Sequence, residues 1–151
     1  MDFNHEVTLQ NRTLLLKIVK NFSLDQLNTV PKGYRNSIFW NLAHIVVTQQ
    51  LLVYGLSNIP LLVDDALVKT YRKGTQTEHD ATEEEFALIK SLMISTIEHT
   101  KLEYDKGVFK NYTSYTTSLN VTLTSVEEAL SFNAFHEGIH LGYILAMKNS
   151  L

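Results

Sequence analysis

The sequence predicts an all-α protein, a single domain of residues 1–151 built as an up-down four-helix bundle. Apolar residues recur at helical spacing over four long stretches. Pro occurs only at positions 31 and 60, outside those stretches, where it interrupts no helix. A chain of 151 residues buries roughly 70% of the surface that its unfolded form exposes, so one hydrophobic core is sufficient.

The first predicted helix spans residues 3–22 and has one apolar stripe. Asn11 is the polar interruption of this stripe. The stripe consists of Phe3, Val7, Leu14, Leu15, Ile18 and Phe22. We expect the helix to pack on the core through these residues.

The second predicted helix, residues 36–56, follows the turn at Pro31 and is apolar on nearly every side. A helix of this kind is buried on two sides. The side opposite His44 is an apolar stripe for which the sequence offers no partner within the chain, and it consists of Phe39, Leu42, Val46 and Val53. This stripe predicts a symmetric homodimer.

The third and fourth predicted helices have clear start signals. Residues 83–105 follow Thr82, which forms a capping box with Glu85. Residues 126–148 follow two overlapping capping boxes, one from Thr124 to Glu127 and one from Ser125 to Glu128.

The connections between the predicted helices are uneven in length. The connection between the second and third helices is long, about residues 57–81, which favours a crossover or a wandering loop. Residues 106–123 are rich in Thr, Tyr and Val and could pair briefly as strands, but we do not predict a sheet there.

Composition excludes several classes of function. The chain has no Cys, so disulfides, thiolate ligands and a cysteine nucleophile are excluded. Its net charge is −3, with 13 basic and 16 acidic residues spread along the chain, so we expect no nucleic-acid partner. There is no signal-peptide pattern at the start, and no apolar run approaches the ~20 residues of a bilayer span. We therefore expect a cytoplasmic protein without membrane contact.

The most informative motif lies on the fourth predicted helix, where residues 136–140 spell H-E-x-x-H. Imidazoles four residues apart lie about 40° apart on a helical wheel and about 6 Å apart along the axis, so His136 and His140 can reach one metal ion. A pair of hydrogen-bonded core histidines is the plain alternative, and spacing alone does not separate the two.

His44 is the candidate for a third metal ligand. It lies in the most apolar helix of the chain, where an unpartnered imidazole would be an unsatisfied polar group. Three neutral imidazoles leave coordination positions open, which is typical of catalytic rather than structural sites. His5, His79 and His99 are most simply solvated surface residues.

Two other metal sites share parts of this pattern. A zinc protease of the H-E-x-x-H type takes its third ligand from further along the chain, but residues 141–151 contain no His, Asp, Glu or Cys. A di-iron carboxylate bundle needs a Glu from each of two helices in addition to two E-x-x-H motifs. The second helix has no carboxylate between Asn36 and Gly55, so the ligand count excludes that reading.

The three histidines and their flanking segments resemble the DinB-like superfamily of metal-binding four-helix bundles, which includes bacillithiol S-transferases and mycothiol-dependent enzymes. The resemblance covers nearly the whole chain. It is carried, in order, by residues 37–45 around His44, by the loop at 67–75, and by residues 132–145 around the histidine pair. Many members have a Gln soon after the last histidine, where this chain has Leu141, so the resemblance does not identify a thiol cosubstrate.

The resemblance and the motifs together imply a divalent metal, zinc or nickel, held by His44, His136 and His140. Such an ion lowers the pKa of water or of a low-molecular-weight thiol, which predicts a transferase or hydrolase acting on a small-molecule substrate. Glu137 could be a general base, and a surface Glu is the alternative.

Three further polar residues are weaker candidates for the pocket, namely Asn41, Asn133 and Tyr143. A noncatalytic metal-binding or stress-associated scaffold is the hypothesis from another class, and the sequence leaves it open.

Overall fold

The computed structural model describes residues 2–151 and confirms the all-α bundle. Four long helices form it, namely α1 (Asp2–Val19), α3 (Ile38–Val53), α5 (Glu83–Asp105) and α6 (Val126–Lys148). Short elements connect them, namely α2 (Leu24–Asn28), the 3₁₀ helix η1 (Gly55–Ser57), α4 (Asp65–Tyr71) and the strands β1 (Tyr115–Thr116) and β2 (Thr122–Leu123).

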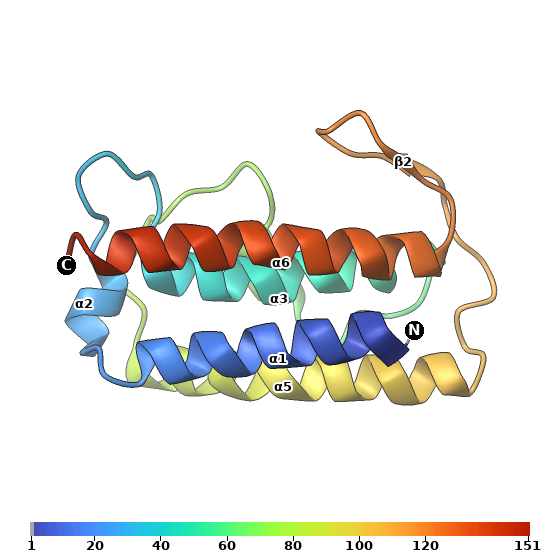
Figure 1. Ribbon diagram of the computed structural model, residues 1–151, viewed down its shortest axis with the longest axis horizontal. Helices are drawn as coiled ribbons and strands as arrows, with labels where there is room; N and C mark the ends of the chain where they lie inside the picture. Colours follow the sequence, from blue (N-terminus) through green and yellow to red (C-terminus); the bar gives the residue numbers. More distant parts are fainter. Residues whose placement is uncertain (1) are drawn as a thin grey trace.

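The four long helices lie roughly parallel to the long axis of the molecule (Figure 1). Helix α3 packs on α6 and α5, and α1 packs on the same two helices from the other side. The long connection after α3 returns along the bundle before α5 begins, so α3 and α5 run in the same direction (Figure 1). The predicted long connection is thus a crossover. It makes α3 and α5 parallel, so the helices do not alternate in direction throughout as the predicted up-down order implies.

The capping signals of the last two long helices give the correct first residues. The Thr82 side chain accepts a hydrogen bond from the backbone N–H of Glu85, and the Glu85 carboxylate accepts one from the backbone N–H of Thr82. At α6, Ser125 is the N-cap and accepts from the backbone N–H of Glu128. Each bond satisfies a backbone N–H that the helix itself leaves without a partner.

Helix α3 is buried on nearly all sides, as its composition predicts. The stripe opposite His44 is covered within the chain, however. Phe39 contacts the ring of Phe86 on α5 with ring centroids 6.3 Å apart, and Leu42, Val46 and Val53 are fully buried. The prediction of a dimer through this stripe was therefore wrong, and the homodimer stays a prediction without that support.

The buried face of α1 differs from the predicted stripe. Phe3 is 77% exposed, and Val7 and Leu14 are also exposed. The face that packs on the bundle instead consists of Thr8, Arg12, Leu15 and Val19. The reason lies in Arg12, which forms a buried ion pair with Glu137 of α6 and turns a partly polar face of α1 inward.

The segment of residues 106–123 contains a short antiparallel hairpin, in which Tyr115 is paired with Leu123 and Thr116 with Thr122. A sheet was not predicted, and this one has two residues per strand. The hairpin projects from the end of the bundle at which α6 begins (Figure 1).

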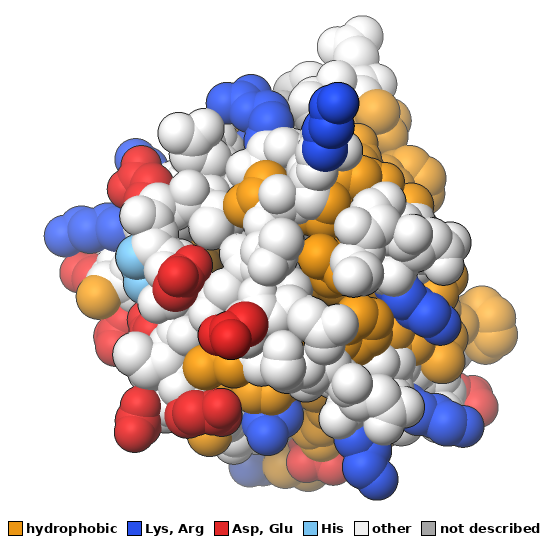
Figure 2. All heavy atoms as spheres, turned by 90° about the vertical axis from the view of Figure 1, so that its left-hand side faces the viewer, with side chains coloured by type: hydrophobic (Ala, Val, Ile, Leu, Met, Phe, Trp, Pro, Cys, Tyr) orange, Lys and Arg blue, Asp and Glu red, His pale blue; other side chains and the backbone are white. Residues whose placement is uncertain are grey.

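Charged side chains of both signs are spread over the end of the bundle that carries α2, and hydrophobic side chains lie between them (Figure 2). That face has no broad basic patch of the kind that phosphate backbones require. Within residues 2–151, every helix is too short or too polar to cross a bilayer. The absence of a nucleic-acid partner stays a prediction.

Candidate metal centre

The structure brings the three predicted histidines together. His44 comes from the middle of α3, and His136 and His140 come from successive turns of α6. One ring nitrogen of each lies within 4.8 Å of the corresponding atoms of the other two. Their ring centroids are 4.5 to 5.2 Å apart. A single metal ion could therefore take a ligand atom from all three.

Two of the rings are oriented by hydrogen bonds on the side away from the cluster. The Nδ1–H of His44 donates to the backbone carbonyl of Tyr71 at 2.6 Å, and the Nδ1–H of His140 donates to Oδ1 of Asn41 at 2.7 Å. Asn41 is itself held, because its Nδ2 donates to the carbonyl of Ser37. With the proton on Nδ1, each Nε2 carries a free lone pair, which is the usual arrangement of a metal-binding imidazole.

The position of His44 is restricted further by its neighbours on α3. The Trp40 ring stacks on the imidazole with centroids 4.5 Å apart and 13° between the planes. The Thr48 hydroxyl lies 3.2 Å from Nε2 and can donate to it. The ring is thus packed on one face, and its Nε2 is paired with the Thr48 hydroxyl, which would have to release the lone pair for a metal ion to bind there.

The contact between His136 and His140 fits a cation. Their Nε2 atoms are 3.1 Å apart, and Nδ1 of His136 is buried without a hydrogen-bond partner among the described residues. Without an ion, one Nε2 must carry a proton for the pair to attract, and Nδ1 of His136 then stays unsatisfied. Three imidazole donors are also a ligand set that zinc and nickel accept, so the residues present fit a divalent metal.

Burial lowers the pKa of all three histidines. The pKa of His136 falls to about 3, because burial and then the neighbouring positive charges of His140, His44 and Arg12 disfavour protonation. The pKa of His140 falls to about 4 through burial and then the charge of His44. The pKa of His44 is lowered by burial, although its hydrogen bond to Tyr71 opposes the shift. All three rings are therefore neutral at pH 7, the form that binds metals.

Glu137 lies in the core rather than on the surface, so the surface alternative was wrong. Its carboxylate accepts hydrogen bonds from Nε and Nη2 of Arg12, the shorter at 2.7 Å, and from Nδ2 of Asn133 at 2.8 Å. Arg12 also donates to the carbonyl of Met93 and the hydroxyl of Thr96 on α5. The pair thus joins three helices beside the histidine cluster. The role of Glu137 as a general base stays a prediction.

The remaining candidates lie outside the three-histidine cluster. His79 and His99 are exposed, as predicted for surface residues. The Nε2 atom of each lies 3.2 Å from a carboxylate oxygen, of Glu85 and of Glu103 respectively. His5 differs from that prediction, because its Nε2 is buried without a hydrogen-bond partner among the described residues. Tyr143 is half exposed, with its ring centroid 6.3 Å from that of His140.

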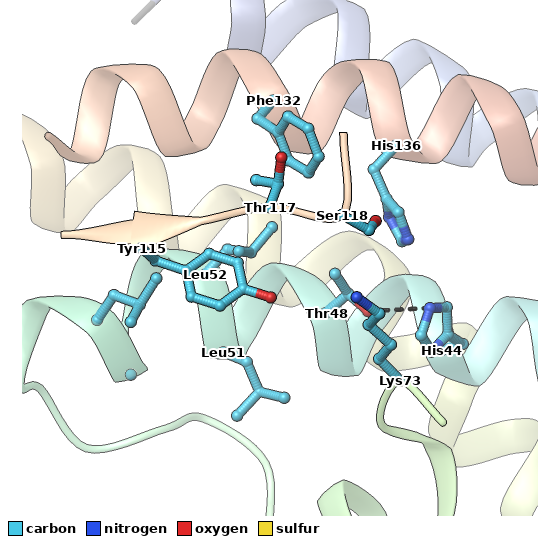
Figure 3. Close-up of a pocket in the computed structure, with 12 residues that line it drawn as sticks. His44, Thr48, Leu51, Leu52, Lys73, Tyr115, Thr117, Ser118, Phe132 and His136 are labelled. Carbon is cyan, nitrogen blue, oxygen red and sulfur yellow. Dashed lines mark hydrogen bonds between the residues drawn. The ribbon is translucent and has the colours of Figure 1, made fainter. Parts of the chain in front are cut away.

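A cavity of about 480 Å³ opens beside the cluster and reaches His44 and His136. Both rings extend toward it, one from α3 and one from α6, and the segment that follows β1 forms part of its wall (Figure 3). A second cavity of about 460 Å³ lies beside His140. The first cavity gives a small molecule a route to two of the three potential ligands.

Sequence reasoning missed several residues that build this site. Tyr71 acts through its backbone carbonyl, which leaves no signal in a sequence. Arg12 could have been recognised as a charged residue among the apolar positions of α1, although its partner on α6 could not. Lys73 reaches the cavity from the turn after α4, and Tyr115 reaches it from β1. Positions in such separate segments become neighbours only in the folded chain.

Comparison with known proteins supports the resemblance drawn from the motifs. None of the curated proteins compared with the chain is a match. The model of the DinB superfamily matches residues 8–144, which include His44, His136 and His140, the whole of α3 and α5, and most of α1 and α6. The chain therefore belongs to the DinB superfamily.

Proposed function

We propose that the protein is a metal-dependent enzyme that transfers or hydrolyses a group of a small-molecule substrate, with zinc or nickel held by His44, His136 and His140. The observation that carries the proposal is the cavity that reaches His44 and His136. A structural metal site is closed by its ligands, whereas a catalytic site keeps a position open to substrate. Three histidine ligands beside a cavity match the second description.

Each residue around the cluster has a definite task in this proposal. The Tyr71 carbonyl and Asn41 hold the protons of His44 and His140 on Nδ1, so that Nε2 of each ring stays available. A bound ion supplies Lewis acidity, which lowers the pKa of water or of a low-molecular-weight thiol and provides a nucleophile near neutral pH. The Thr48 hydroxyl, which lines the cavity, can orient a polar group of the substrate.

The walls of the cavity support chemistry on a substrate held away from bulk water. Leu51, Leu52 and Phe132 line it, and none of them offers a polar side-chain atom. In such surroundings each electrostatic interaction with a reacting group is stronger than in water. An apolar cavity that ends at two of the three histidines is what an enzyme that acts on a bound molecule requires.

Cobalt substitution tests the proposal even while the substrate is unidentified. The protein is loaded with Co²⁺, and its visible spectrum is followed as cysteine, 2-mercaptoethanol or azide is added. We expect at least one of them to change the spectrum, because an open coordination position accepts sulfur or a small anion. If none of these probes changes the Co²⁺ spectrum, the proposed enzymatic function is contradicted and a noncatalytic metal-binding scaffold is favoured.

A further inference from the structure

We propose that the cavity beside His44 and His136 binds an amphipathic anion, a molecule with an apolar body and one negatively charged oxyanion head. The head lies near Lys73 and the histidines, and the body extends along Leu51 and Leu52. This inference rests on the proposed function, since it names the class of substrate for the same site.

The cavity has an apolar end. Leu51 and Leu52 of α3 lie on one side of it, and Leu56 of η1 and Phe132 of α6 complete this part of the wall. Figure 3 shows Leu51, Leu52 and the Tyr115 ring at the end away from the histidines. An apolar group placed there leaves water and gains about 25 cal/mol for each Å² that it buries.

The other end of the cavity is polar and positively charged. Lys73 extends its side chain from the segment after α4 toward Thr48 and His44 (Figure 3). Its ammonium group makes no hydrogen bond or ion pair with any residue that the structure describes. Ser118 and the hydroxyl of Tyr115 also face this region (Figure 3). A ligand that enters the cavity therefore meets one unpaired cation and several hydroxyl donors.

The charge of the lining selects an anion. Among the described residues that line the cavity, Lys73 is the only Lys or Arg, and there is no Asp or Glu. The histidines are neutral at pH 7, and a bound metal adds further positive charge. A cationic ligand would face this charge without a counter-ion, whereas an oxyanion would pair with Lys73 and accept hydrogen bonds from the hydroxyl groups.

The volume of the cavity sets the size of the ligand. At about 480 Å³ it lies within the range of pockets that hold whole small molecules. Acetate or another small anion would leave the apolar end filled with water, so affinity should rise with the length of the apolar body. Octanoate is a suitable probe because it combines one carboxylate with an apolar chain.

The test is calorimetric titration of the zinc-loaded and the metal-free protein with octanoate, octylamine and acetate. We expect octanoate to bind both forms, and octylamine and acetate to bind at least tenfold more weakly. Equal binding of octylamine and octanoate would overturn the inference, as would the absence of octanoate binding to both forms.

Two lysine variants separate a specific contact from general attraction. Lys73→Ala should weaken octanoate binding about twofold to fivefold, the scale of an exposed ion pair. Lys69→Ala is the matched control, because Lys69 lies on α4 and does not line the cavity. Unchanged octanoate binding in Lys73→Ala, or an equal loss in Lys69→Ala, would refute the role of Lys73.

The two proposals can fail separately. If no thiol or anion probe changes the Co²⁺ spectrum while octanoate binding still depends on Lys73, the catalytic proposal is refuted and the anion site stands. If thiols change the Co²⁺ spectrum but octanoate does not bind, the metal proposal stands and the substrate class is wrong.

Discussion

Glu137→Gln separates two accounts of this residue, as a general base and as the partner of a buried Arg. Glu137 and Arg12 have fully buried side chains, and their closest N–O contact is 2.7 Å. Gln has nearly the same shape as Glu but no negative charge. The variant therefore leaves the Arg12 guanidinium in the core without a counter-ion. The amide N–H₂ of Gln also replaces one acceptor oxygen and faces donors of Arg12 or of Asn133.

The expected cost is large. Breaking a buried ion pair by removing one partner destabilises a protein by about 3–5 kcal/mol. In a domain of this size each kcal/mol lowers Tm by roughly 2–4 °C, so Glu137→Gln should melt about 6–20 °C below the wild type. A general base outside any structural pair predicts a different result, namely an unchanged Tm and a loss of turnover of roughly 10²-fold.

Thermal unfolding of the metal-free proteins, followed by circular dichroism, measures this difference without contributions from metal binding. Arg12→Met combined with Glu137→Leu provides the control, because replacing both charges removes the buried unpaired ion. The double variant should be more stable than either single variant. A Glu137→Gln protein that melts within 2 °C of the wild type, a small fraction of the expected fall of roughly 6–20 °C, would refute the ion-pair account.

Two further predictions concern the histidines and their supports. Stability of the metal-free protein should be full above pH 6.5 and fall as the pH drops toward 4, because the pKa of His136 is lowered to about 3 and that of His140 to about 4. Between these pH values the unfolded chain binds protons that the folded chain does not, so the free energy of unfolding falls by about 1.4 kcal/mol per histidine per pH unit. Urea unfolding at pH 7.5, 6 and 5 measures this fall, and equal stability at all three pH values would contradict it. Asn41→Leu should weaken Zn²⁺ about 10- to 100-fold in competition with a chelator, whereas Asn41→Asp keeps the acceptor oxygen and should preserve affinity. Equal affinity of Asn41→Leu and the wild type would exclude a supporting role for this residue.

The parts of the fold that could be predicted are those determined by local signals. Helices α5 and α6 begin and end at the predicted residues, because a side-chain cap, an apolar pattern and the absence of Pro act within a few residues of each other. The histidine cluster could also be predicted. An imidazole in the most apolar helix needs a partner, and a pair spaced by four residues on another buried face offers one.

The remaining features depend on contacts between distant parts of the chain. The inward face of α1 follows from Arg12, whose partner Glu137 lies 125 residues away. The apolar stripe of α3 was assigned to a dimer because the sequence does not show that Phe86 of α5 covers it. Helix α4 and the position of Lys73 depend on how the crossover folds over α3, which periodicity does not describe.

Metal content per chain tests the central claim most directly. Untagged protein and single His→Ala variants are loaded with Zn²⁺, dialysed and analysed by mass spectrometry of the metal. The wild type should retain one ion per chain, and variants at positions 44, 136 and 140 should each lose it, whereas those at positions 79 and 99 should keep it. A wild type that retains no metal, or a His79→Ala protein that loses it while His44→Ala keeps it, would contradict the three-histidine site.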